Sequence, residues 1–87
     1  MTSKETKMSV LSSHADIVFT EEGDRTRAEA VLDLGGMHFY GLGDARRAAG
    51  DPDLPIVGEQ LSASRALSDL AHKLLDAAAA RVEKFGD

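Results

Sequence analysis

The chain is poor in the residues that usually mark a chemical or membrane function: it has no cysteine, no tryptophan and two prolines in 87 residues. Without cysteine it has no disulfide framework, no thiolate metal site and no cysteine nucleophile. No apolar run approaches the roughly 18 residues of a membrane span, and residues 1–13 lack the apolar core of a signal peptide. We therefore expect a cytoplasmic protein that does not enter a membrane.

Positive charge and aromatic rings are also scarce. Ten basic side chains stand against 15 acidic ones, which gives a net charge of −5, and the aromatic residues are three Phe and one Tyr. Phosphate contacts need clustered Lys and Arg, and base stacking needs several rings on one exposed face. Composition therefore argues against nucleic-acid binding through bulk charge or stacking.

Catalytic and metal-binding patterns are missing as well. His14, His38 and His72 are far apart and form no ligand pair at helical spacing. Ser62 and Ser64 have no base near them in the sequence, and hydroxyls in the first turns of a helix usually accept hydrogen bonds from free backbone amides. We expect no enzyme activity, no cofactor, no metal and no small-molecule substrate.

The glycines Gly41 and Gly43 resemble a nucleotide-binding motif only in part. The sequence lacks the third glycine and the surrounding parallel βαβ unit that such a motif needs. A bulge, or close packing at the end of the third strand, is the better interpretation.

What the chain does contain is three strand patterns followed by a loop and a helix pattern. Residues 14–20 alternate and lead into a turn at 21–24, and residues 25–34 alternate most cleanly before the turn at 35–36. In the second strand we expect one face toward the helix (Ala28, Ala30, Leu32, Leu34) and the other toward water (Arg27, Glu29, Val31, Asp33). The third strand, 37–47, has large side chains on both faces, which predicts cover on both sides.

Both prolines lie between the third strand and the helix. Pro52 and Pro55 predict an ordered loop, which Leu54, Ile56 and Val57 anchor to the core.

The long helix pattern covers residues 58–85. On a helical wheel eight of its apolar residues fall within about 140° and form one wide stripe: Leu67, Leu70, Ala71, Leu74, Leu75, Ala78, Val82 and Phe85. The stripe predicts a lid on the sheet. The expected fold is α+β, a three-stranded antiparallel meander, a loop and one long C-terminal helix packed on one sheet face (β-β-β-α). We expect a single domain, 13–87, after a flexible tail, 1–12.

The predicted helix is longer than the predicted sheet. Twenty-eight helical residues span about 42 Å, and strands of about eight residues reach about 27 Å. The last turns, with Val82 and Phe85, therefore extend past the sheet, and a second copy of the chain is the simplest way to bury them. Fraying after Ala80, or curling of the helix over the N-terminal segment, is the alternative. We expect a homodimer, and we add His38 and Tyr40 of the third strand to its candidate contacts.

Three charged residues of the helix, Arg65, Asp69 and Lys73, follow one another at intervals of four. Such a ladder stabilises a helix by a few tenths of a kcal/mol and is typical of a solvated face.

The segments EEGDRTRAEAVL (21–32) and GLGDARRAAGDPDLPIVGEQLSASRALSDLAHKLL (41–75) resemble a family of small actinobacterial proteins of unknown function. That family is described as having a double-stranded-RNA-binding-domain-like fold. The resemblance covers about residues 14–83, and the most telling positions are Gly41, Gly43, Ala45, Arg46, Asp51, Pro52, Pro55, Gly58, Glu59, Arg65, Ala66, Leu67, Asp69 and Leu70. It implies the same β-β-β-α arrangement, and it implies no activity.

The resemblance does not extend to the RNA-binding residues of true double-stranded-RNA-binding domains. There, a Lys-Lys-x-Ala-Lys cluster opens the last helix and grips phosphates. Here Arg46 and Arg47 are followed by Gly50-Asp51-Pro52, and the helix opens with Glu59 and leaves Arg65 as its early cation. The RNA-contacting first helix is also missing from the pattern. We accept the fold analogy and reject the inference of RNA binding from it.

Four arginines are the candidate contacts for an anion or RNA: Arg25, Arg27, Arg46 and Arg47. A hairpin sheet brings Arg25 and Arg27 near the end of the third strand, and a dimer doubles the cluster. The alternative is ordinary solvated arginine neutralised by nearby acids, and the sequence favours this alternative. Those acids are Glu21, Glu22, Glu29 and Asp44.

Three functions follow as hypotheses. The leading one is a non-enzymatic homodimeric binding module in bacterial stress or dormancy, associated with the ribosome, because a helix-backed sheet is similar to part of the fold of ribosome-hibernation factors. The second is a protein–protein adaptor with no nucleic-acid role, whose acidic surface binds a basic partner. The third is an enzyme with a site across a dimer interface, around His38, Tyr40 and Arg46.

Overall fold

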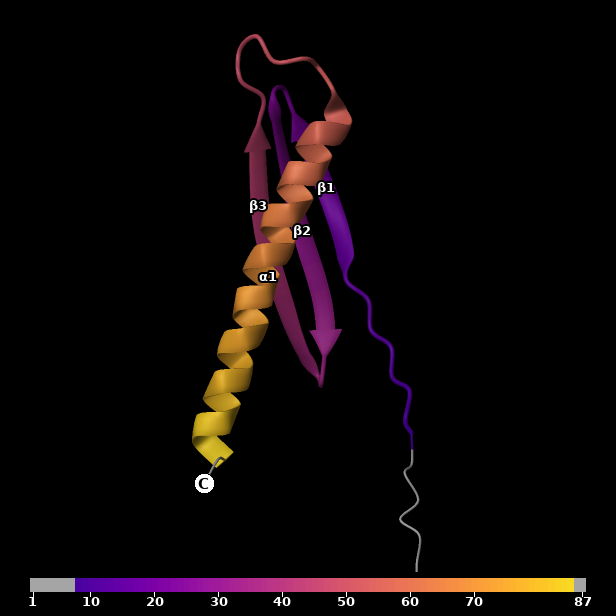
Figure 1. The fold of residues 1–87 in the computed structure, drawn as a ribbon, viewed down its shortest axis with the longest axis vertical. Coiled ribbons are helices and arrows are strands. Elements are labelled where there is room, and N and C mark those ends of the chain that lie inside the picture. Colours follow the sequence, from indigo (N-terminus) through magenta and orange to yellow (C-terminus); the bar gives the residue numbers. More distant parts are fainter. Residues whose placement is uncertain (1–7, 86–87) are drawn as a thin grey trace, which may run out of the picture.

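The computed structural model describes residues 8–85, which form one three-stranded sheet and one long helix. The strands β1 (Asp16–Glu22), β2 (Arg25–Leu34) and β3 (Met37–Arg46) are antiparallel and lie in the order β1-β2-β3. The helix α1 (Pro55–Phe85) lies across one face of this sheet (Figure 1). The predicted β-β-β-α fold is confirmed. Of the predicted tail, residues 1–7 lie outside the described part of the chain, and residues 8–12 belong to no helix or strand.

Two tight turns set the register of the sheet. Glu22 pairs with Arg25 and Leu34 pairs with Met37, so two residues close each hairpin. Gly23 in the first turn has a φ of 62°, and both glycines of the second turn also have positive φ. L-residues rarely adopt this conformation, whereas glycine does so without a steric penalty. The turns predicted from these glycines are confirmed.

The side of the sheet that faces α1 is lined by small side chains. Thr26, Ala28 and Ala30 of β2 are buried there, as the alternation of that strand predicts. At the far end of β2, Leu34 stays 46% exposed. The buried hydrophobic residues of the described chain are Ala28, Ala30, Ala45, Ala66 and Leu70.

Gly41 and Gly43 allow the helix to lie directly on β3. A Cβ on Gly41 would stand 2.8 Å from Leu70 Cβ, and a Cβ on Gly43 would stand 2.8 Å from Arg65 Cβ. The pairing of β2 with β3 is continuous through both glycines. Close packing is therefore the correct interpretation of this motif, the bulge is wrong, and the contact lies in the middle of the strand rather than at its end.

Ser62 is 0% exposed in this contact, and among residues 8–85 no larger side chain is as completely enclosed. Its hydroxyl donates to the Glu59 carbonyl at 3.3 Å, and the Ser64 hydroxyl donates to the Leu61 carbonyl at 2.9 Å. The expectation that these serines accept hydrogen bonds from free amides is wrong, because within a helix the nearest partner of a hydroxyl is a carbonyl of the preceding turn.

The helix begins at Pro55, three residues before the predicted start. Proline suits the first helical position, where no amide donor is needed and its fixed φ is already helical. Leu54, Ile56 and Val57 are about half exposed. They are therefore not part of the buried core, and their predicted role as anchors of a loop to that core is wrong; Leu54 and Val57 instead line a cavity at the start of α1.

Only part of the apolar stripe predicted on the helix contacts the sheet: Leu70 and Leu74 do, whereas its other members stay exposed. Ser62, Ala66 and Leu70 make the buried contact, and Leu74 packs beside them. The close approach at Gly41 and Gly43 selects the helix face with small side chains, so most of the large ones stay outside. We call the exposed remainder the apolar helix stripe: Leu67, Ala71, Leu75, Ala78, Val82 and Phe85.

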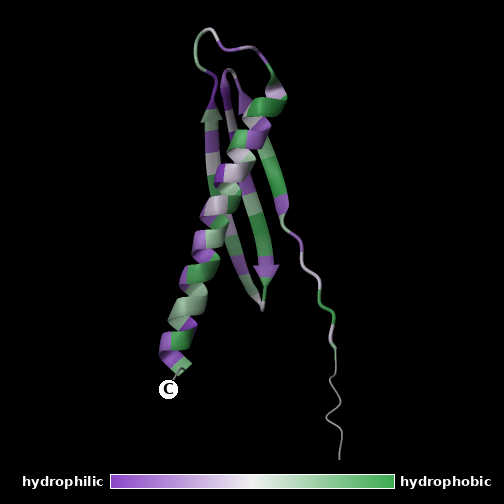
Figure 2. Ribbon diagram, in the orientation of Figure 1, coloured by the Kyte–Doolittle hydropathy of each residue, from purple (hydrophilic) through white to green (hydrophobic). Residues whose placement is uncertain are grey.

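The molecule is elongated, with extents of 70 × 28 × 19 Å and a radius of gyration of 18.8 Å. A compact chain of this length would have a radius of gyration of about 12 Å. The last turns of α1 extend past the turn between β2 and β3 (Figure 1). Near that turn, Arg81 donates to Met37 Sδ at 3.6 Å, and α1 continues for one more turn. Figure 2 shows hydrophobic residues along α1 as far as these last turns.

Candidate binding surfaces

The face of the sheet opposite α1 carries four apolar residues near its centre. Register sets Val31 of β2 opposite Tyr40 of β3, and it places Val18 of β1 and Leu42 of β3 on either side of Glu29 of β2. Val18, Tyr40 and Leu42 are 47–55% exposed. We call these four residues the outer apolar patch. The prediction that β3 is covered on both sides is therefore wrong for the described chain, in which the helix covers one side.

Three of the four predicted arginine contacts gather at one end of this outer face. Arg25 and Arg46 are register partners, and Arg27 follows on the same face of β2. Both Arg25 and Arg27 bind Asp44 Oδ1, at 3.3 and 3.2 Å. These two guanidinium groups, Arg25 first, hold the pKa of Asp44 below its usual range.

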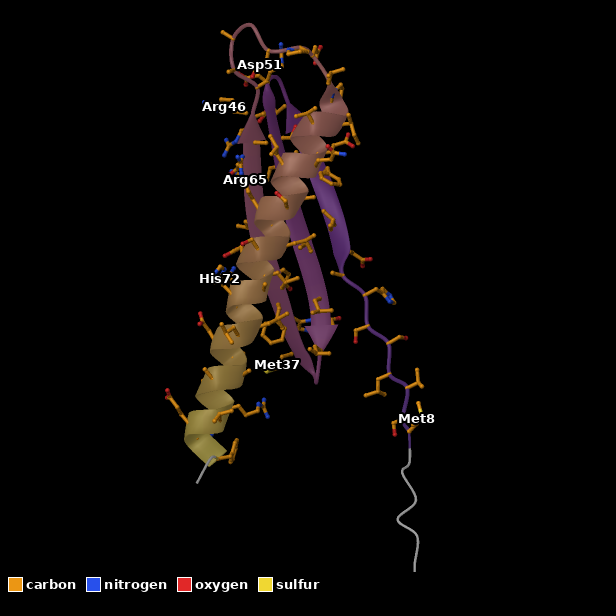
Figure 3. The ribbon with its side chains drawn as sticks, in the orientation of Figure 1. Met8, Met37, Arg46, Asp51, Arg65 and His72 are labelled. Atoms are coloured by element: carbon orange, nitrogen blue, oxygen red, sulfur yellow. The ribbon has the colours of Figure 1, made fainter. Side chains whose placement is uncertain are left out.

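Arg46, together with the fourth arginine, Arg47, lies where β3 ends. Arg46 approaches Asp24 at 3.9 Å, and the Arg47 amide donates to the Asp24 carbonyl at 2.8 Å. Figure 3 shows Arg46 at the end of β3 next to the loop. The structure thus brings the arginines together and places Asp24 and Asp44 among them. Of the acids expected to neutralise them, Asp44 does so through ion pairs with Arg25 and Arg27, whereas Glu21, Glu22 and Glu29 form none among residues 8–85.

The charged ladder of the helix is not a solvated face. Arg65 donates to the Asp44 carbonyl at 2.6 Å, Asp69 accepts from the Leu42 amide at 2.9 Å, and Lys73 donates to the Tyr40 carbonyl at 2.7 Å. These bonds satisfy backbone groups along the outer edge of β3, and Figure 3 shows Arg65 on the side of α1 toward β3. The Leu42 amide, then Lys73, lowers the pKa of Asp69.

The sequence analysis did not predict that the ladder binds the backbone of β3, although one signal was present. Four residues of helix rise about 6.0 Å and two residues of strand about 6.8 Å, so successive residues of the ladder match alternate residues of β3. A charged ladder on a helix that packs against an edge strand is therefore a candidate for capping that edge.

The opposite edge of the sheet, along β1, is acidic. Asp16, Glu21 and Glu22 lie on this strand, and Glu59 of α1 lies beside Glu21. The side-chain contact with Glu59, partial burial and repulsion together raise the pKa of Glu21. We call these four residues the acidic flank. None of them forms an ion pair with another residue of the 8–85 segment.

The four predicted dimer contacts fall on two different surfaces. His38 and Tyr40 lie on the outer face of the sheet, where His38 Nδ1 pairs with Asp33. Val82 and Phe85 lie on the overhanging end of α1, 66% and 70% exposed. With Ala78 and Arg81 they line a shallow apolar hollow.

The residues of the proposed enzyme site are far apart in one protomer. His38 and Arg46 stand at opposite ends of β3, about 27 Å apart along the strand. A cavity of about 240 Å³ lies between the β1–β2 turn, the loop and the start of α1. Arg46 lines it together with Glu21, Asp24 and Asp51, whereas His38 and Tyr40 do not.

Within residues 8–85, no three acidic or histidine side chains are grouped as a metal site requires. In the same part of the chain, α1 lacks the hydrophobicity that crossing a bilayer would need.

Comparison with known proteins places the chain in one family. Residues 12–87 match the family model described as Rv2632c-like. Uncharacterized protein Rv2632c of Mycobacterium tuberculosis is 37% identical over 68 residues, which are 78% of this chain and 73% of that protein. Uncharacterized protein Mb1767 of Mycobacterium bovis is 40% identical over 60 residues, 69% of this chain and 64% of that protein.

The fold is shared as well. The crystal structure of Rv2632c superimposes with a TM-score of 0.86 at 31% sequence identity, and the match covers 93% of this chain and 96% of that one. These relatives are mycobacterial, as expected of an actinobacterial family. Because the family model matches residues 12–87 and the structural match covers 93% of the chain, the chain belongs to the Rv2632c-like family.

Proposed function

We propose that this chain is a non-enzymatic binding module that associates into a homodimer. The observation that carries the proposal is the exposed apolar surface of the overhanging helix, where Val82 and Phe85 have no sheet beneath them. A chain of this length buries only about 60–65% of the surface that its unfolded form exposes. Each Å² of apolar surface that a second copy covers adds roughly 25 cal/mol.

The small core supports the same proposal. Apart from Leu70, the buried residues where helix and sheet meet are small, while many larger side chains lie in the apolar helix stripe and the outer apolar patch. Association through the C-terminal part of the helix stripe, at Ala78, Val82 and Phe85, would bury side chains that the close helix–sheet contact leaves outside. Size-exclusion chromatography with light scattering tests this: we expect the dimer mass, and a strict monomer at high micromolar concentration would contradict it.

We further propose that the dimer associates with the bacterial ribosome in stress or dormancy. Analogy with part of the fold of ribosome-hibernation factors supports it, as does the arginine end of the sheet, which a dimer doubles. The family's description as having a double-stranded-RNA-binding-domain-like fold is an analogy of fold and does not by itself support RNA binding. The net charge of −5 and the ion pairs of Asp44 weigh against it.

Co-sedimentation with ribosomes at low and raised salt is the test. We expect association at low salt that declines as salt rises, because phosphate contacts are screened and compete with counterions. Absence from the ribosomal pellet at low salt would rule this partner out.

A protein–protein adaptor is the second candidate, and the acidic flank favours it. Four carboxyl groups on one edge suit a basic protein partner better than a polyanion. Affinity capture that returns one protein and no ribosomal material would support the adaptor.

A further inference from the structure

The two edges of the sheet differ in how they are closed. On β3, three side chains of α1 form hydrogen bonds with the outward backbone groups of alternate residues. Arg65 donates to the Asp44 carbonyl, Asp69 accepts from the Leu42 amide, and Lys73 donates to the Tyr40 carbonyl. On β1, α1 forms no such ladder: within residues 8–85 no side chain of α1 hydrogen-bonds a backbone group of that strand, although Glu59 lies beside Glu21. The helix lies over β2 and β3, so β1 forms the open side of the sheet (Figure 1).

Register identifies the backbone groups that this open edge presents. Glu22 and Arg25 flank a two-residue turn, so they exchange hydrogen bonds, and bonding then alternates along the hairpin. Ile17, Phe19 and Glu21 consequently direct their amides and carbonyls away from β2. Within residues 8–85, no hydrogen bond outside the strand pairing joins these groups. The edge therefore presents the unpaired amides and carbonyls of three alternate residues, in the geometry that accepts another strand.

The charged side chains of β1 itself are all acidic. Glu22 and Asp16 point to the outer face, and Glu21 meets Glu59 on the helix side. The nearest cations on β2, Arg25 and Arg27, bind Asp44 on the far strand instead. Two carboxyl groups in contact without a cation are unfavourable, and an incoming Lys or Arg would relieve that repulsion.

An apolar shelf lies on the helix side of the same edge. Phe19 of β1 is 40% exposed and Leu67 of α1 is 41% exposed. Leu67 follows Arg65 by two residues, about 200° around the helix, so it lies on the side of α1 away from β3, to which Arg65 points. An added strand would place alternate side chains over this shelf.

A second copy of β1 is a poor occupant of the edge. Antiparallel pairing of β1 with itself about Phe19 would set Asp16 opposite Glu22, and like charges directly opposite are destabilising. Charge complementarity therefore selects a basic segment.

We propose that the open edge of β1 binds an extended basic peptide of a protein partner as a fourth strand. Its backbone pairs with Ile17, Phe19 and Glu21, its basic side chains meet the acidic flank, and an apolar side chain covers Phe19 and Leu67. The proposal rests on the adaptor function and names its site and its ligand class.

The probe is a blocked eight-residue peptide that alternates Lys and Val, titrated into the full chain and followed by fluorescence anisotropy and amide exchange. We expect binding that weakens with salt and new exchange protection at Ile17, Phe19 and Glu21. The matched peptide is N-methylated at alternate residues, so it keeps its charge but cannot pair with a strand. Equal binding of this peptide would overturn strand addition. Protection of those amides before peptide is added would also overturn it, since the edge would then be occupied by another segment or a second copy.

The charge contribution is measured with the double variant Glu21→Gln, Glu59→Gln, with Glu83→Gln at the far end of α1 as control. Loss of two exposed charge pairs should weaken binding about fivefold, and the control should bind as the parent chain does. Unchanged affinity of the double variant would contradict the role of the flank. If a captured protein partner binds the double variant normally, the adaptor function stands and the edge proposal fails.

Discussion

Gly41 of β3 and Leu70 of α1 are in direct contact, because a Cβ on the glycine would stand 2.6 Å from the Leu70 amide nitrogen and 2.8 Å from Leu70 Cβ. Two residues further along β3, Gly43 meets the helix four residues earlier, beside Ala66 and Arg65. The repeat of two strand residues, about 6.8 Å, matches the repeat of four helix residues, about 6.0 Å. One spacing rule therefore positions both the helix on the strand and its charged ladder along the edge.

Gly43→Ala should destabilise the fold by roughly 1–3 kcal/mol, because the new methyl group meets helix backbone that cannot rotate away. Urea denaturation measures the loss as a lower midpoint. Gly58→Ala is the matched control: its Cβ would meet the Thr26 hydroxyl at 2.8 Å, a small group that can turn aside. Alanine also favours a helix by about 1 kcal/mol. Equal losses of unfolding free energy in the two variants would show that the close helix–strand contact at Gly43 tolerates a methyl group as well as Gly58 does.

Asp69→Asn should change how stability depends on pH. The pKa of Asp69 is lowered in the fold by the Leu42 amide and then by Lys73. Its stabilisation is therefore present above the unfolded pKa of about 3.9 and is lost as pH falls through the lower folded value. At neutral pH the variant should have a lower urea midpoint than the parent chain. As the pH is lowered, its midpoint should then fall less steeply than that of the parent chain. Asp76→Asn, on the same helix, should keep the full acid dependence of the parent chain.

Glu21→Gln should have the opposite effect. The contact with Glu59 and partial burial raise the pKa of Glu21 in the fold. A carboxyl group with a raised folded pKa destabilises the fold once both states are ionised, and stability rises as pH falls through that value. We expect the variant to unfold at higher urea than the parent chain at neutral pH. A Glu22→Gln variant that gained as much would show that general charge reduction, not the Glu59 contact, is responsible.

Asp44→Asn should convert the arginine end of the sheet into an anion-binding surface. Arg25 and Arg27 would lose the carboxylate that both of them bind. Retention on immobilised heparin should move to higher salt than for the parent chain. Asp33→Asn, at the other end of the outer face, removes the same charge and serves as control. Equal shifts in both variants would indicate net charge as the cause.

Phe85→Ser should shift the monomer–dimer equilibrium toward the monomer if the overhanging helix forms the interface, since buried interface aromatics contribute strongly to association. Light scattering across a dilution series measures the shift. Met8→Ser replaces a side chain that is 84% exposed in the N-terminal segment and should leave the equilibrium unchanged. A dimer that tolerates Phe85→Ser would place the interface elsewhere, with the outer apolar patch as the next surface to test.

The order of elements could be predicted from the sequence because its signals are local. Alternation in β2, glycines at the two turns and helical periodicity after Pro55 each depend on residues a few positions apart. The arginine cluster was predictable for the same reason, since strand register follows from the turns. The start of α1 was misplaced because Pro55 was interpreted as part of a loop, although proline is also well suited to begin a helix.

The sequence by itself thus determined the β-β-β-α order, the turns and the charge carried by each segment. The tertiary structure decided which helix face meets the sheet, which edge is capped and which charges pair. Periodicity selects the face with the largest apolar residues, whereas the absence of a Cβ at Gly41 and Gly43 admits the face that carries Ser62 and Ala66. With that face against the sheet, Arg65, Asp69 and Lys73 point toward β3, and the edge of β1 stays open. A helix is rigid, so the direction of one face determines the direction of all the others.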